Sequence, residues 1–154
     1  MGKKEREIQD PSEIEAILDK ARVCRLALAE DNRPYVVPLN FGYKDNCLYF
    51  HTGKAGKKID ILQRNNRVCF QVDVDLEVVE SDNPCDWNMN YRSVIGHGRA
   101  VFLEDPAEKK HALDIIVEHY GAAKSDYDEA RLRRLTLIKV EIERMTGKRS
   151  MVLT

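Results

Sequence analysis

The stretch from Arg33 to Lys58 constrains the fold of this chain more than any other part of the sequence. Residues 34–43 and 47–51 are rich in Val, Leu, Tyr and Phe, and residues of this kind favour β-strands. Between them, Lys44-Asp45-Asn46 has the composition of a tight hairpin turn. Two strands joined by so short a turn run antiparallel, which excludes parallel strands with a crossover helix in this region.

The rest of the chain continues this pattern. Further strand-like apolar segments occur at residues 23–29, 68–74, 76–79, 93–103 and 136–142. The first of them is followed by Asp31-Asn-Arg-Pro34, which predicts a turn. Two helix starts share an Asp cap, a Pro in the first turn and a following Glu; they are Asp10-Pro11-Ser12-Glu13 and Asp105-Pro106-Ala107-Glu108. Shorter helices are predicted over 54–64 and 125–135. We therefore expect a mainly β protein of the α+β class, with an antiparallel sheet closed as a barrel and flanking helices packed outside.

The composition limits the range of partners and sites. The 154 residues suit a single domain over 1–154, with the charged residues 1–9 as a flexible N-terminal extension. A formal net charge of −1 does not favour nucleic acid or a membrane surface. The chain has no long apolar run and no signal-peptide core. Its cysteines are expected to be reduced, buried thiols, which fits a cytoplasmic location. Its four cysteines lack CxxC spacing, and no metal site is predicted.

The segment from His51 to Lys58 is a candidate anion-binding site. A strand ends at His51 and a helix begins within a few residues, and the free amides of a helix start attract anions. Gly56 allows the backbone to approach a ligand closely. A hydroxyl donor and positive charge come from Thr52, Lys57 and Lys58. A solvated turn of Lys and Gly would have the same composition.

A second candidate segment is Val37-Pro38-Leu39-Asn40. Pro38 cannot donate to a strand ladder, so it indicates a sheet edge or a bulge, where main-chain groups are free for a ligand. The Asn40 amide offers both a donor and an acceptor to the polar edge of a heterocycle. An ordinary core strand with a bulge is the structural alternative.

A third candidate lies where the strand over 93–103 begins. Arg92 and Ser93 are residue types that bind phosphate. Two glycines, Gly96 and Gly98, predict a bend or the close approach of another backbone. His97 between them is expected to be structural, because the sequence places no acidic or nucleophilic partner beside it.

Together these segments resemble the split-barrel proteins that bind flavin mononucleotide (FMN) and are related to pyridoxamine 5′-phosphate oxidase. Within that family the chain is most similar to the nitroimidazole-resistance (NimA-like) branch. The resemblance runs from about Ile14 to Lys148 and lies in the order and spacing of four pieces. These are Arg33-Pro-Tyr-Val-Val-Pro-Leu-Asn-Phe41, Leu48-Tyr-Phe-His51 with Gly56-Lys-Lys58-Ile59, Cys85-Asp-Trp87 with Tyr91-Arg-Ser-Val-Ile-Gly96, and Thr146-Gly-Lys148.

The resemblance implies a six-stranded antiparallel FMN-binding split β-barrel and a homodimer that binds FMN in the cleft between its subunits. The backbone expected to lie along the isoalloxazine ring is that of Val37, Pro38, Leu39 and Asn40. The phosphate side is assigned to His51, Thr52, Lys57 and Lys58, with Ser93 as a further contact. In the NimA-like branch the position of His51 is linked to the active site, so His51 is the one catalytic candidate.

The end of the chain departs from the vitamin B6 oxidases. Those enzymes carry a C-terminal Arg-x-His and a Trp-x-x-x-Arg-Leu-x-Pro-like ending that help to bind the pyridoxal substrate. This chain ends Thr146-Gly-Lys-Arg-Ser-Met-Val-Leu-Thr154, so oxidation of pyridoxamine phosphate is not expected.

Two functions of different classes follow from the resemblance. The first is an FMN-dependent oxidoreductase that passes electrons to a small electrophile such as a nitroaromatic or a quinone. The second is a non-catalytic protein that binds, stores or senses flavin, or carries haem, because one fold hosts many functions. No dinucleotide-binding fingerprint indicates the electron donor, and the physiological substrate is not specified by the sequence.

Overall fold

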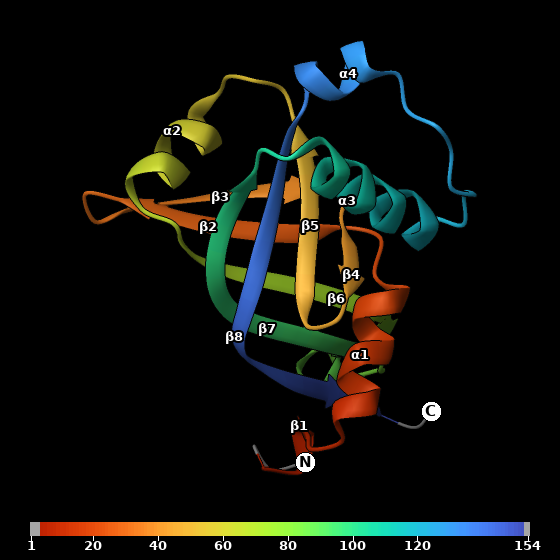
Figure 1. The fold of residues 1–154 in the computed structure, drawn as a ribbon. Helices are drawn as coiled ribbons and strands as arrows, with labels where there is room; N and C mark the ends of the chain where they lie inside the picture. Colours follow the sequence, from red (N-terminus) through yellow and green to blue (C-terminus); the bar gives the residue numbers. More distant parts are fainter. Residues whose placement is uncertain (1–3, 153–154) are drawn as a thin grey trace.

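The predicted antiparallel sheet is present. The computed structural model describes residues 4–152, and within them eight strands form one sheet in the order β3-β2-β6-β7-β8-β5-β4, with β1 pairing with β8 (Figure 1). The strands are β1 (Glu7–Ile8), β2 (Cys24–Glu30), β3 (Arg33–Leu39), β4 (Gly42–Lys44), β5 (Cys47–Thr52), β6 (Arg67–Val79), β7 (Asn88–Leu103) and β8 (Thr136–Ser150). The predicted fold class is confirmed. The count exceeds the expected six because β1 and β4, of two and three residues, join the sheet as short additions.

Two hairpin turns set the register of the first strands. Asp31 and Asn32 have φ values of 48° and 60°, and Asp45 and Asn46 have φ values of 49° and 60°. A positive φ at both central residues is the signature of the type I′ turn, whose twist matches that of paired strands. Asp and Asn tolerate this conformation better than most side chains. The turns predicted after 23–29 and after 34–43 are therefore confirmed.

The helices begin where their caps predict. They are α1 (Pro11–Lys20), α2 (Lys57–Arg64), α3 (Pro106–His119) and α4 (Glu129–Arg134). The Asp10 carboxylate accepts a hydrogen bond from the Ser12 amide, and the Asp105 carboxylate accepts one from the Glu108 amide. Asp128 caps α4 in the same way, so this helix begins later than the predicted 125–135. Figure 1 shows α3 and α4 near one end of the barrel and α1 near the other.

Two long strands, β7 and β8, link the two ends of the barrel. They run beyond the predicted segments 93–103 and 136–142, since β7 begins at Asn88 and β8 continues to Ser150. A Cβ at Gly98 would lie 2.3 Å from the carbonyl oxygen of Glu141 on β8, and a Cβ at Gly96 would lie 2.1 Å from the ring of Phe70. The predicted close approach is thus confirmed, and it coincides with a register shift between His97 and Gly98.

The apolar side chains separate into two clusters. The larger fills the barrel and includes the fully buried Phe41, Phe50 and Phe70. The smaller lies between α3, α4 and strands β5 and β8, around Leu113 and Leu137. Because the barrel interior is filled by its own side chains, it leaves no room for a flat ligand inside.

The start of the chain differs from the expected flexible extension. Glu7 and Ile8 pair with Lys148 and Gly147 of β8, and the Ile8 side chain is buried in the main cluster. The buried apolar residue explains why this segment is ordered in the sheet. Residues 1–3 of the expected extension lie outside the described residues. Within 4–152, no helix has both the length and the apolar character required to cross a membrane.

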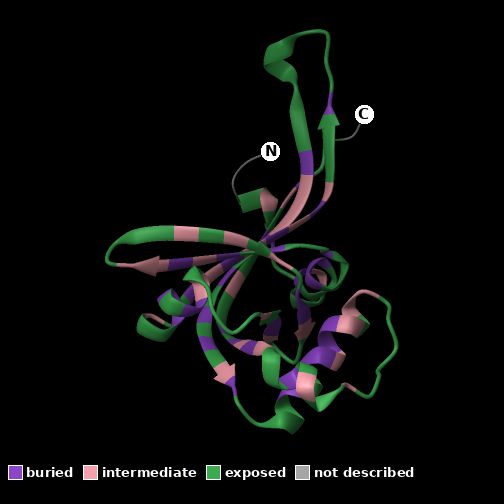
Figure 2. Cartoon of the chain, turned by 90° about the horizontal axis from the view of Figure 1, so that it is seen from above, coloured by how far each residue is buried: buried purple, intermediate pink, exposed green. Residues whose placement is uncertain are grey.

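The hairpin formed by β6 and β7 projects from the rest of the molecule (Figure 2). We call its outer part, Asp75–Asn90, the arm. A short 3-10 turn, Pro84–Asp86, lies at its tip. Most residues of the arm are exposed.

Candidate functional site

Strand β3 lies at one end of the strand order, so one of its edges is unpaired within the described chain. Val37 and Leu39 pack partly against the barrel core, whereas Pro38 and Asn40 are exposed. This alternation is typical of a strand with one face on a core. The edge position predicted from Pro38 is confirmed. The main chain of Val37 and Leu39 pairs with Leu26 and Cys24 of β2, so the free edge at this point is that of Pro38.

The start of α2 is an uncapped helix terminus. Gly56 is the N-cap residue, at φ 148°, and no side chain bonds the amides of the first turn. A Cβ is strained at this φ, so the position suits glycine. Lys57 is exposed and Lys58 half-buried, and both belong to the first turn. Free amides, the helix dipole and two lysine residues therefore occur together in one helical turn, a combination that suits the binding of a phosphate.

A cation–π contact joins these two segments. The Lys57 Nζ lies 4.6 Å from the centre of the Tyr35 ring, within the range at which an ammonium is attracted to an aromatic face. Tyr35 belongs to β3 and Lys57 to α2. The structure thus places the exposed edge strand beside the helix start. Tyr35 is not among the site residues predicted from the sequence, where its only signal is its place in the aromatic-rich strand.

His51 and Thr52 form the end of β5, where they pair with Leu137 and Thr136 of β8. Thr52 is half-buried and His51 is exposed. Removal of water by the neighbouring protein lowers the pKa of the His51 imidazole. A neutral imidazole at pH 7 can donate one hydrogen bond and accept another. Among residues 4–152, no hydrogen bond or ion pair engages this ring.

Ser93 lies on a different part of the surface. It is in β7, opposite Asp73 of β6, and β7 is three strands from β3 in the sheet order. Three strand spacings amount to about 14 Å, which is beyond hydrogen-bond reach. The structure therefore does not bring Ser93 into contact with Val37–Asn40 of the same chain.

Polar side chains occupy the surface between Pro38 and Ser93. Arg25 of β2 is directly opposite Pro38 and also opposite Gln71. The Asp73 carboxylate accepts a hydrogen bond of 2.8 Å from the Gln71 amide and lies 3.5 Å from the Arg25 guanidinium. The sequence analysis missed this group, although the period-two alternation of β2 and β6 places its members on one face.

One tyrosine holds the bend that follows β3. The Tyr120 hydroxyl accepts a hydrogen bond of 3.1 Å from the Phe41 amide and donates one of 2.8 Å to the Arg22 carbonyl. Phe41 is fully buried, and the ring of His119 lies 4.4 Å from it. These contacts tie α3 to the bend between β3 and β4, and so fix the end of the edge strand. His119 accordingly has a structural role, and its ring nitrogen lies 2.7 Å from the Ala21 carbonyl oxygen.

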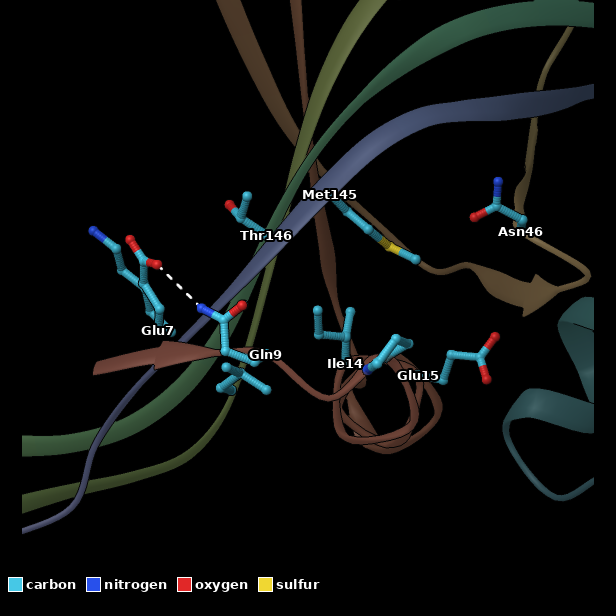
Figure 3. A pocket seen from close by; sticks show the side chains of 11 residues that line it. Glu7, Gln9, Ile14, Glu15, Asn46, Met145 and Thr146 are labelled. Carbon is cyan, nitrogen blue, oxygen red and sulfur yellow. Dashed lines mark hydrogen bonds between the residues drawn. The ribbon is translucent and has the colours of Figure 1, made fainter. Parts of the chain in front are cut away.

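A cavity of about 580 Å³ lies at the other end of β5, between β1, α1 and the end of β8. In Figure 3, Met145 of β8 and Ile14 of α1 point toward each other across it. Its polar lining includes Glu15, whose carboxylate accepts a hydrogen bond from the Tyr43 hydroxyl. None of the predicted site residues lines this cavity. The candidate site is instead an open surface, which needs a second wall to enclose a ligand.

No metal centre is found in the described part of the chain, since no group of three or more His, Cys, Asp or Glu side chains has a suitable arrangement there. Cys24 is buried and its pKa is raised to about 12 by the loss of solvent. A thiol in such surroundings stays protonated and behaves as a small apolar residue. The four cysteines are all unpaired in the described structure.

Comparison with known proteins identifies the family. The family model for pyridoxamine 5′-phosphate oxidase matches residues 10–149. The structure of a candidate 5-nitroimidazole antibiotic resistance protein from Bacteroides thetaiotaomicron matches with a TM-score of 0.83 and 39% identity, covering 92% of this chain and 85% of that one. An FAD-binding protein from Mesorhizobium loti matches with a TM-score of 0.69 and 29% identity, covering 95% and 98%. An uncharacterized protein of Rhizobium meliloti, RA0666, is 29% identical over 115 residues, 71% of this chain and 68% of its own length.

The fold and the match over most of the chain define a split-barrel protein. The chain belongs to the pyridoxamine 5′-phosphate oxidase family. The predicted resemblance, including its similarity to a nitroimidazole-resistance relative, is confirmed.

Proposed function

We propose that this chain binds FMN in a site completed by a second copy, and that it uses the flavin to pass electrons to a small electrophile such as a nitroaromatic or a quinone. The observation that carries the proposal is the uncapped start of α2, whose Lys57 contacts Tyr35 on the exposed edge strand. A phosphate fits the first feature and a flat ring the second. Family membership and the relatives described as FAD-binding and as a candidate nitroimidazole resistance protein support a flavin.

FMN suits this helix start better than FAD. The terminal phosphate of FMN is close to a dianion at pH 7 and can point directly at the amides of Lys57 and Lys58. In FAD each phosphate of the linkage carries one charge, and the adenosine beyond it needs additional surface. His51 and Thr52, at the end of β5, would add hydrogen bonds on the phosphate side. The segment Val37–Asn40 would lie along the ring.

A homodimer supplies the missing wall of the site. Within one chain the candidate residues lie on an open surface, and Ser93 is too far from β3 to reach the same end of a ligand. In a pair of chains, Ser93 would contact a flavin held mainly by the other copy. When bound, FMN supplies the redox chemistry, taking up two electrons from a reductant and delivering them to the electrophile. The neutral His51 imidazole would donate or accept a proton beside it.

Reconstitution tests the proposal. The purified protein, freed of ligand and verified as folded, is titrated with FMN, FAD and riboflavin while flavin fluorescence is recorded. FMN is expected to bind most tightly, and the loaded protein to oxidise NAD(P)H in the presence of a nitroaromatic or a quinone. Absence of FMN binding by folded protein would refute the proposal, and tighter binding of FAD would reassign the cofactor.

A non-catalytic flavin carrier is the alternative, and one observation favours it. The His51 ring has no hydrogen-bond partner among residues 4–152, so the described chain contains no proton relay to it. Tight FMN binding without turnover under any reductant would support this alternative. In either case we propose a cytoplasmic protein, on the strength of its unpaired cysteines, and one that does not oxidise pyridoxamine phosphate.

A further inference from the structure

The cavity of about 580 Å³ beside α1 has no part in the flavin site proposed above. It is lined by Asn46, in the turn before β5, whereas His51 and Thr52 lie at the far end of the same strand. Cavities of about 300–1,000 Å³ are the usual size of small-molecule sites. A ligand in this cavity is therefore bound apart from the flavin.

A gap along one edge of β8 creates the cavity. On that edge β5 pairs with β8 as far as Glu141, and β1 pairs with it from Gly147. Just beyond β5, the Asn46 side chain donates a hydrogen bond of 3.1 Å to the Ile142 carbonyl. Among residues 4–152, no strand pairs with 143–146 on this side. The main-chain groups that point to this side are free for a ligand.

Apolar side chains form the walls of the cavity. Ile8 and Ile14 are buried, and Met145 is half-buried. Figure 3 shows Ile14 and Met145 pointing toward each other across the space. A Cβ at Gly147 would lie 3.0 Å from the side chains of both Ile8 and Ile14, so glycine allows β1 and α1 to pack closely against β8. Such walls suit a ligand with an apolar body.

The polar side chains around these walls offer mainly hydrogen-bond acceptors. The Gln9 amide donates a hydrogen bond of 3.3 Å to the Glu7 carboxylate (Figure 3). The Asn46 amide nitrogen is engaged as described above, so the amide oxygens of Gln9 and Asn46 remain. One oxygen of the Glu15 carboxylate accepts a hydrogen bond of 2.8 Å from the Tyr43 hydroxyl, which leaves its second oxygen. A ligand that donates hydrogen bonds matches this set.

Glu15 supplies the negative charge of the cavity. Burial raises the pKa of the Tyr43 hydroxyl, and the hydrogen bond to Glu15 raises it further, so this donor persists at neutral pH and holds the carboxylate. Lys148 also lines the cavity, but it is directly opposite Glu7 in the β1–β8 register, where unlike charges attract. Within the described chain, no Lys or Arg forms an ion pair with Glu15. Its carboxylate is available to a cationic ligand.

We propose that this cavity binds a primary ammonium compound with an apolar body. The body lies between Ile14 and Met145, and the ammonium donates hydrogen bonds to Glu15 and to the amide oxygen of Asn46. An anion is repelled by Glu7 and Glu15, and a neutral apolar molecule gains nothing from these acceptors. Because the ligand contacts α1, β1, β8 and the turn before β5, it also stabilises the folded chain.

A set of probes with one chain length and different charge tests the proposal. Hexylamine, hexanol and hexanoate are titrated into protein whose methionine methyl groups carry ¹³C, and Met145→Leu identifies the Met145 signal. Hexylamine is expected to shift that signal saturably, with an affinity about fivefold or more above that of hexanol. Hexanoate should give no saturable shift. Methylamine should bind about tenfold more weakly than hexylamine, because it lacks the apolar body. Met89, on the projecting hairpin, should not respond.

Two variants predict changes of opposite sign. Glu15→Gln retains an acceptor for Tyr43 and should lower the affinity for hexylamine about fivefold or more, without changing that for hexanol. Lys148→Met removes the cation that competes with the ligand and should raise the affinity for hexylamine about two- to fivefold. Misfolding cannot cause such a gain. The matched control Glu108→Gln neutralises an exposed carboxylate of α3 outside the cavity and should have no effect.

Three results would overturn the proposal. Equal affinities for the three hexyl probes would show that the cavity does not select a cation. The absence of a saturable Met145 shift with hexylamine would show that it binds no such ligand. An equal loss of hexylamine and hexanol binding in Glu15→Gln would mean that Glu15 supports the wall without contacting the ammonium. The titrations need no flavin, so their outcome is independent of the proposed function.

Discussion

Replacement of Lys57 and Lys58 by alanine is the most direct perturbation of the proposed phosphate site. Both side chains belong to the first turn of α2, where no side chain caps the helix. A charge-assisted hydrogen bond contributes about 1.5–3 kcal/mol when it is shielded from water. Because Lys57 is exposed and Lys58 only half-buried, we expect the pair together to contribute about 1–3 kcal/mol to FMN binding. That corresponds to a rise in Kd of about 5- to 150-fold.

The assay is a pair of fluorescence titrations, one with FMN and one with riboflavin. Riboflavin has the same ring and ribityl chain but no phosphate, so its affinity should change little. Comparing the change in FMN affinity with the change in riboflavin affinity separates the loss of a phosphate contact from general damage to the site. The control variant Lys110→Ala/Lys124→Ala removes the same two charges from α3 and the segment after it, and should alter neither affinity.

Two results would refute the reasoning. If the variant lowers the affinities for FMN and riboflavin equally, the lysines support the site without contacting phosphate. If neither affinity changes, the phosphate is bound elsewhere. Loss of the contact between Lys57 and Tyr35 is expected to reduce stability by only about 0.5–1 kcal/mol, so the variant should remain folded.

Three further predictions concern the fold and its response to pH. The pKa of His51 is lowered in the folded state, so below a pH of about 6.5 the unfolded chain binds more protons, and the free energy of unfolding should fall as pH decreases toward the folded pKa. The urea midpoints measured at pH 7.5 and at pH 5.5 should therefore lie closer together in His51→Gln than in the unchanged protein. An equal separation in both proteins would show that His51 does not cause the pH dependence. Gly96→Ala places a Cβ against the Phe70 ring and should lower the free energy of unfolding by about 1–3 kcal/mol, measured by heat or urea. The double variant Gly96→Ala/Phe70→Leu should regain part of this stability, because the smaller side chain makes room for the Cβ. If it regains none, backbone strain and not the ring contact causes the loss. Tyr120→Phe leaves the Phe41 amide without its acceptor and should lower the free energy of unfolding by about 1–3 kcal/mol. Hydrogen exchange at the Phe41 amide should become faster. An unchanged exchange rate would show that packing alone holds the bend between β3 and β4.

Local signals in the sequence predicted most of the fold. Asp31-Asn32 and Asp45-Asn46 predicted two turns, and the Asp10 and Asp105 caps predicted two helix starts, because each depends only on neighbouring residues. The full length of β8 was missed. Its second half, Glu141–Ser150, contains five charged residues and no regular alternation of buried positions. It gains its order from pairing with β7 and β1, a contact between segments far apart in the chain.

The candidate site was predicted less completely, for the same reason. The edge position of Pro38 and the helix start at Lys57 could be inferred locally. Their proximity through Tyr35 depends on how β3 and α2 pack, which no spacing in the sequence encodes. Ser93 was grouped with them by resemblance, and the single chain places it three strands away from β3. In the proposed site, Ser93 reaches the ligand only from a second copy.

The two prolines of β3 have a consequence for solubility. Pro34 and Pro38 are opposite Ala29 and Arg25 of β2, and neither has an amide hydrogen to donate. Since residues two apart in a strand direct their hydrogen-bonding groups to the same side, the free edge of β3 carries Pro34, Val36 and Pro38. Only Val36 of these can donate to an incoming strand. The free edge of β3 is thereby a poor template for the addition of further strands, which lowers its tendency to aggregate.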